Sequence, residues 1–72
     1  MEEKILKCLK TAFELDTVDN TCSQMTCEKW DSIGQLNLVV ELEMEFGVYL
    51  EPEEIGEMKS VEDIKRILSA KL

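Results

Sequence analysis

The chain has 72 residues, which is room for a single small domain over residues 1–72 and excludes a multidomain enzyme. Its composition, with 44% apolar and 33% charged residues but only three glycines and one proline, favours a folded helical chain over a disordered one. Sixteen acidic residues against eight basic ones give a formal net charge of −8, which disfavours binding to nucleic acids and anionic lipids and favours basic partners. Because the core of so short a chain is small, a carrier, adaptor or subunit is favoured over an enzyme.

The N-terminal segment predicts one amphipathic helix over Met1–Phe13, because its apolar residues recur at helical spacing. They are Ile5, Leu6, Leu9, Ala12 and Phe13. Residues 15–31 lose this period and are rich in Asp, Asn, Ser and Thr, which predicts a long loop. A loop of this length in so small a domain usually has a function or covers another element.

The next segment predicts a second helix over Ser32–Phe46, ended by Gly47 in the left-handed conformation. Its apolar residues form two stripes. The first stripe is Leu38, Val39, Leu42 and Phe46, and the second is Ile33, Leu36, Val40 and Met44. The polar arc of the helix is Gly34, Asn37, Glu41 and Glu45. One stripe should pack in the core. The other is either covered by the 15–31 loop or exposed to a partner, and periodicity alone does not decide between these alternatives.

Two more helices complete the prediction. Pro52 suits a first helical position, so we expect a short helix over Pro52–Glu57. Ser60 suits the N-cap of a final helix with an apolar stripe. Its members are Val61, Ile64, Ile67, Leu68 and Leu72. The sequence therefore predicts an all-α fold, a small four-helix bundle of three main helices and one short one.

The cysteines and the hydropathy bear on compartment and metals. Cys8, Cys22 and Cys27 are odd in number, and there is no histidine, no CxxC pair and no apolar N-terminal signal segment. We expect a monomer in the reducing cytoplasm, with no metal site and no membrane span.

The start of the second helix is open to two interpretations. Ser32 and Gln35 have the spacing of a capping box, in which the serine is simply the N-cap. Ser32 could also be a nucleophile, but the chain has no histidine to activate it, so any activation would come from another protein. Gly34 would then keep the first turn slim enough for that protein to approach.

The wider string resembles the attachment motif and second helix of the acyl carrier proteins. The resemblance rests on Asp31-Ser32-Ile33 followed by Leu36, Leu38, Val39, Leu42, Glu43, Glu45, Phe46 and Gly47, and continues to Ser60-Val61-Glu62-Asp63-Ile64. It implies that Ser32 accepts a 4′-phosphopantetheine arm from coenzyme A through a phosphopantetheinyl transferase, with Asp31 in the recognition motif. A helix N-terminus suits such a phosphodiester, because its free N–H groups and dipole favour an anion.

The resemblance also implies partners and a cargo. Loading ligases and acyl-processing enzymes with basic patches would dock on the second helix, with candidate contacts Ile33, Leu36, Val40, Glu41 and Met44. The cargo would be an acyl thioester of fatty-acid, polyketide or related biosynthesis, for which the flexible side chains of Met25, Met44 and Met58 could yield.

Differences from the family pattern leave the cargo open. Ile33 replaces the usual leucine, Trp30 precedes the motif, and Gly34 and Gln35 replace acidic and small polar residues. An aminoacyl carrier, such as a D-alanine carrier, remains an alternative from the same chemistry. An unmodified acidic helical adaptor is an alternative of another class.

Overall fold

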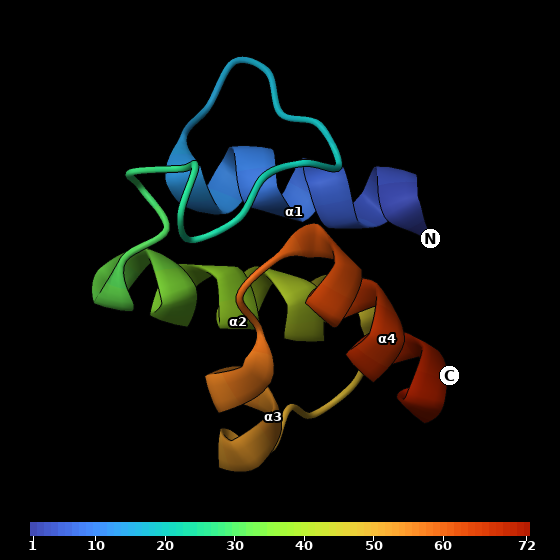
Figure 1. Cartoon of the computed structure of the whole chain (residues 1–72). Coiled ribbons are helices and arrows are strands. Elements are labelled where there is room, and N and C mark those ends of the chain that lie inside the picture. Colours follow the sequence, from blue (N-terminus) through green and yellow to red (C-terminus); the bar gives the residue numbers. More distant parts are fainter.

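The computed structural model describes all 72 residues and contains four helices and no named strand. These are α1 (Glu2–Phe13), α2 (Ser32–Phe46), α3 (Pro52–Glu57) and α4 (Val61–Lys71). The predicted all-α class is therefore confirmed. Helix α1 packs along α2 and also contacts α4, and both chain ends lie on the same side of the molecule (Figure 1).

The core is apolar and includes side chains of α1, α2 and α4 and of the segments between the helices. Its most completely buried side chains are Ile5, Leu9, Leu38, Leu42, Leu50, Met58, Val61, Ile64 and Leu68. The stripe predicted for the last helix is confirmed at four of its five positions. Leu72 is the exception, because it lies beyond the end of α4 and its side chain is 64% exposed.

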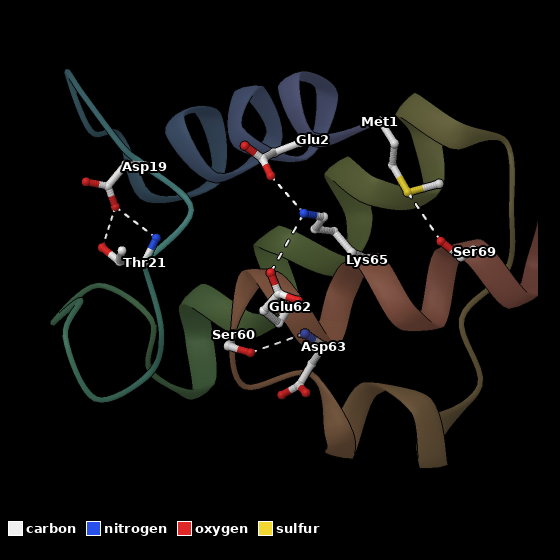
Figure 2. Close-up of polar contacts among 9 residues, drawn as sticks. All are labelled: Met1, Glu2, Asp19, Thr21, Ser60, Glu62, Asp63, Lys65 and Ser69. Atoms are coloured by element: carbon white, nitrogen blue, oxygen red, sulfur yellow. Dashed lines mark hydrogen bonds and ion pairs between the residues drawn. The ribbon is translucent and has the colours of Figure 1, made fainter.

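Local capping signals define three of the helix ends as expected: the end of α2 and the beginnings of α3 and α4. Gly47 closes α2 with a φ of 64°, in the left-handed region where glycine has no Cβ to strain. Pro52 stands at the beginning of α3. The Ser60 hydroxyl accepts a hydrogen bond of 3.2 Å from the Asp63 N–H and caps α4 (Figure 2).

The N-terminal end of α1 is held against α4 by polar contacts at the surface. The Lys65 ammonium lies 2.8 Å from Glu2 Oε1 and 3.7 Å from Glu62 Oε1, and the Ser69 hydroxyl lies 3.8 Å from Met1 Sδ (Figure 2). The hydrogen bond and charge of Lys65 lower the pKa of the Glu2 carboxyl and correspondingly raise the pKa of Lys65. Because these groups lie at the surface and remain partly exposed to solvent, we regard the contacts as a minor contribution to stability.

The segment between α1 and α2, residues 14–31, consists of turns and one isolated antiparallel bridge between Ser23 and Ser60. Two backbone hydrogen bonds accompany the bridge, from Gln24 N–H to the Lys59 carbonyl at 2.9 Å and from Val61 N–H to the Cys22 carbonyl at 3.3 Å. The segment is thus attached to the junction of α3 and α4. The alternative in which it covers the second stripe of α2 is wrong, because all four residues of that stripe are exposed.

Candidate functional site

The first turn of α2 is capped by Asp31, one residue earlier than the capping-box interpretation required. Asp31 has an extended backbone, and its Oδ1 accepts a hydrogen bond of 2.8 Å from the Gly34 N–H. Ser32 is the first helical residue. The interpretation of Ser32 as the N-cap is therefore wrong, since the aspartate already performs that role.

The Ser32 side chain is exposed and its hydroxyl takes part in no hydrogen bond of the structure. The backbone N–H groups of Ser32 and Ile33 are also unpaired, as expected in the first turn of a helix. A free hydroxyl thus stands beside two free N–H donors at the positive end of a 15-residue helix. This arrangement can hold an anionic group attached to the serine.

Gln35 does not complete a capping box but connects α2 to α3. Its Nε2 donates to the backbone carbonyls of Ile55 at 2.7 Å and Met58 at 3.2 Å, at the C-terminal end of α3. Its Oε1 accepts a hydrogen bond from the indole Nε1 of Trp30. The side chain therefore adds a hydrogen bond to two carbonyls that already have one, since the Ile55 carbonyl also accepts the Met58 N–H at 3.2 Å and the Met58 carbonyl also accepts from Gln24 Nε2 at 3.5 Å.

Trp30 is buried, with an exposed fraction of 3%, and its ring centroid lies 5.5 Å from that of Phe13. The sequence had marked this tryptophan only as a departure from a family pattern. Its structural role is to anchor the residue before the attachment motif to α1, with an aromatic contact on one side and the bond to Gln35 on the other. The five-residue spacing to Gln35 gave no signal for that bond.

Gly34 was expected on the polar arc of α2 and is instead buried. A Cβ at this position would lie 2.0 Å from the Lys29 carbonyl oxygen and 3.0 Å from Phe13 Cε1. The expectation was wrong because the chain preceding α2 folds back against the helix, a long-range contact that helical periodicity does not contain. Gly34 permits this approach of two backbones and does not thin the exposed side of the turn.

The second stripe of α2, which we call the outer face, is exposed along the helix. The exposed fractions are 71% for Ile33, 64% for Leu36, 52% for Val40 and 75% for Met44. Glu41, the remaining candidate contact, is half-buried on the same helix. Four neighbouring apolar side chains in water form a surface that is suited to a partner.

The other carboxylates near α2 are partly engaged within the chain. Glu43 Oε2 accepts a hydrogen bond of 2.9 Å from the Leu50 N–H, which fixes the chain after the helix. Glu45 forms an ion pair of 3.4 Å with Lys7 of α1. Glu41 makes no ion pair, so of these three it is the carboxylate free to meet a basic partner.

An open pocket with a mixed polar and apolar lining lies directly beside Ser32. It has a volume of about 540 Å³ and lies between the first turn of α2, the end of α3 and the 14–31 segment. Asp31, Ser32 and Gln35 contribute to one wall, and Lys59 contributes to another. Sequence reasoning missed Lys59, because nothing local connects a residue after α3 with the beginning of α2.

The cysteines are free thiols with different surroundings. Burial raises the pKa of the Cys8 thiol to about 11, with a smaller contribution from the Glu45 and Glu41 charges. Burial, and then hydrogen bonding with Cys27, raises the pKa of Cys22 to about 12. Buried thiols with such pKa values are poor nucleophiles near neutral pH.

Only one of the three methionines expected to yield to a cargo lies in the core. Met58 is buried, whereas Met25 and Met44 are 96% and 75% exposed. The expectation was wrong for these two, because one lies in the 14–31 segment and the other on the outer face of α2. A core that opens by the movement of several methionines is therefore not available.

No family model, curated protein or solved structure matches the chain. None of its helices has both the length and the apolar character that crossing a membrane requires. Nowhere do three or more histidine, cysteine or acidic side chains gather in a way that could hold a metal ion.

Proposed function

We propose that the chain is an acyl carrier protein that holds a 4′-phosphopantetheine arm on Ser32 and delivers acyl thioesters to partner enzymes. The observation that carries the proposal is the exposed Ser32 hydroxyl, which has no capping role and stands at a helix N-terminus whose cap is Asp31. The four-helix bundle with a long loop between its first two helices, expected from the sequence, is part of this proposal.

The residues at this position fit the arm. Transfer from coenzyme A forms a bond between the Ser32 oxygen and phosphorus and releases the adenosine bisphosphate part of the coenzyme. The product is a phosphodiester anion, for which the free N–H groups of Ser32 and Ile33 are suitable donors. Because the chain has no histidine, the base that removes the hydroxyl proton belongs to the transferase. The terminal thiol of the arm supplies the thioester chemistry.

The outer face of α2 is the proposed docking surface for the transferase, the loading ligase and the acyl-processing enzymes. It begins at Ile33, directly after the attachment residue, so a partner seated on it lies close to the arm. Exposed apolar side chains with the free carboxylate of Glu41 beside them suit a basic, transient partner. The proposal places the carrier in the cytoplasm as a monomer between encounters.

Intact mass is the measurement that tests this function. The purified chain is incubated with coenzyme A, Mg²⁺ and a broad-specificity phosphopantetheinyl transferase. We expect the chain to gain the mass of one phosphopantetheine and Ser32→Ala to gain none. Ser69→Ala is the matched control, because Ser69 is also an exposed helical serine but lies on α4, and it should be modified like the parent.

The alternatives give different results in the same scheme. An aminoacyl carrier would be modified on Ser32 in the same way, and mass analysis of the thioester formed in cell extract would identify an amino acid. An unmodified adaptor would bind its partner through the outer face of α2, gain no mass, and retain activity as Ser32→Ala. Failure of a folded chain to gain mass would therefore refute the carrier proposal and favour the adaptor.

A further inference from the structure

The 14–31 segment holds two of the three cysteines, Cys22 and Cys27, side by side. The residues between them form a closed turn, in which the Ser23 carbonyl accepts hydrogen bonds from the Thr26 N–H at 3.2 Å and the Cys27 N–H at 2.9 Å. Thr26 Oγ1 in turn accepts the Ser23 N–H at 3.0 Å. Because the turn folds the chain back on itself, the Cys22 thiol lies in hydrogen-bonding contact with Cys27.

Both sulfur atoms belong to the lining of one open pocket. This pocket has a volume of about 630 Å³ and lies within the 14–31 segment. Cys27 is half-buried, whereas Cys22 is only 8% exposed, so a reagent in the pocket meets the Cys27 sulfur first. Cys8, the third thiol, is buried on α1, donates to the Glu41 carbonyl at 3.6 Å, and does not line this pocket. A reagent of moderate size therefore reaches the pair and not Cys8.

The backbones of the two cysteines are bonded to different parts of the fold. The Cys22 carbonyl accepts the Val61 N–H at 3.3 Å, at the beginning of α4. The Cys27 carbonyl accepts the Trp30 N–H at 3.0 Å, directly before the cap of α2. A covalent bond between the two sulfur atoms would therefore fasten the beginning of α4 to the chain that precedes Asp31.

We propose that Cys22 and Cys27 form a reversible disulfide by exchange with a low-molecular-weight disulfide such as oxidised glutathione, and that this bridge fastens the chain before α2 to the beginning of α4. Thiols that are already in contact need little movement to reach the geometry of a disulfide. The inference does not depend on an arm at Ser32. In the reducing cytoplasm proposed for the chain, the bridge is transient and forms when oxidised disulfides accumulate.

The exchange takes two steps, and the reagent is the oxidant. The Cys27 thiolate attacks one sulfur of oxidised glutathione, the S–S bond of the reagent breaks, and one glutathione leaves and takes up the proton that Cys27 lost. The Cys22 sulfur then attacks the Cys27 sulfur, and the second glutathione leaves with the proton of Cys22. Two protein thiols are thus oxidised by two electrons, and one disulfide is reduced to two thiols.

The second step uses a thiol that is a weak nucleophile in the reduced chain. Burial, and then the hydrogen bond and charge of Cys27, raise the pKa of Cys22 to about 12. The two contributions of Cys27 disappear once its sulfur carries glutathione, because a mixed disulfide has neither the thiol proton nor the charge. The step is also intramolecular, and the contact between the two residues gives it a high effective concentration.

Peptide mass analysis tests the bridge. The folded chain is equilibrated with mixtures of reduced and oxidised glutathione, quenched with acid, and alkylated with N-ethylmaleimide in denaturant. Trypsin then releases residues 11–29, a peptide that contains Cys22 and Cys27 without Cys8 or Ser32. We expect oxidised glutathione to leave this peptide lighter by two hydrogens, with no glutathione and no maleimide, while Cys8 is alkylated. Excess reduced glutathione should restore two maleimide additions.

Two variants separate the steps. Cys22→Ser cannot close the bridge and should retain one glutathione on Cys27. Cys27→Ser, at the more exposed position, should form neither bridge nor adduct. Two-dimensional NMR should show the Val61 and Trp30 amide signals shifting between the reduced and oxidised parent, and the same treatment should leave them in place in Cys27→Ser.

Three results would overturn the inference. The first is a parent chain that accumulates glutathione on Cys27 and forms no bridge. The second is oxidation of Cys8 as readily as that of the pair. The third is a bridged chain whose Val61 and Trp30 signals match those of the reduced chain, because the bridge would then fasten nothing.

Discussion

Substitution of Gly34 by alanine tests the close approach that shapes the attachment site. The added Cβ would lie 2.0 Å from the Lys29 carbonyl oxygen, about 1.4 Å short of ordinary van der Waals contact. It would also lie 3.0 Å from Phe13 Cε1. The oxygen belongs to the backbone immediately before Trp30, so relief of the clash requires a shift of the chain that anchors Trp30 in the core.

The magnitude follows from two opposing effects. Overpacking of a buried site costs about 1 to 3 kcal/mol. Replacement of a helical glycine by alanine returns about 1 kcal/mol of helix propensity. Because the atom that must move is backbone and not the end of a flexible side chain, we expect the cost to lie near the top of its range. Gly34→Ala should therefore lower the free energy of unfolding by about 1 to 2 kcal/mol, or the melting temperature by about 5 to 15 °C for a domain of this size.

Gly56→Ala is the matched control for this experiment. Gly56 is also helical, but a Cβ there would meet nothing within 4 Å, so the same substitution should leave stability unchanged or raise it by up to about 1 kcal/mol. Thermal and urea unfolding, followed by far-ultraviolet circular dichroism, measure both variants. The argument is refuted if Gly34→Ala is as stable as the parent chain, or if the two variants change stability in the same direction.

Four further predictions follow from the structure. Asp31→Ala removes the cap of α2 and should lower the free energy of unfolding, measured in urea, by about 1 kcal/mol. Asp31→Asn keeps a capping oxygen and should retain most of that free energy. Leu36→Glu should change the free energy of unfolding by less than about 0.5 kcal/mol, since the side chain is exposed, yet slow modification by the transferase in a timed mass assay. A thiol reagent near about pH 8 should label Cys27 before Cys8 and Cys22, because burial holds the pKa values of those two thiols at about 11 and about 12. Both thiols keep their protons in the folded chain above the unfolded pKa of 9.0, so unfolding releases protons there. Urea midpoints should therefore be constant between neutral pH and that value and fall as the pH rises through 11.

The helix ends could be predicted because their causes are local. Gly47, Pro52 and Ser60 each act through the backbone of residues at most four positions away, so the sequence contains the whole interaction. The N-cap of α2 was misplaced by one residue for a related reason. Asp31 and Ser32 are both good capping residues, and only the fold of the preceding chain determines which of them has the extended backbone.

The orientation of α2 could not be predicted, because its apolar arc is wide enough to bury either stripe. The choice is made by distant contacts. Packing of α1 along α2 buries Leu38 and Leu42, and attachment of the 14–31 segment to the α3–α4 junction leaves the outer face uncovered. Gly34 turned inward for the same reason, since its partner is a backbone oxygen of that segment.

Three of the residues that depart from the acyl carrier pattern form one packed unit. Trp30 packs against Phe13 with the two rings tilted and donates a hydrogen bond to Gln35. Gln35 donates to the end of α3, and Gly34 leaves room for the backbone before Trp30. These departures therefore compensate one another inside the fold and say little about docking. They do shape the pocket beside the attachment serine, because the side chains of Trp30 and Gln35 both line it. The hydrogen bonds of Gln35 thus connect the unusual sequence before α2 to the end of α3 and to the surface that surrounds the attachment serine.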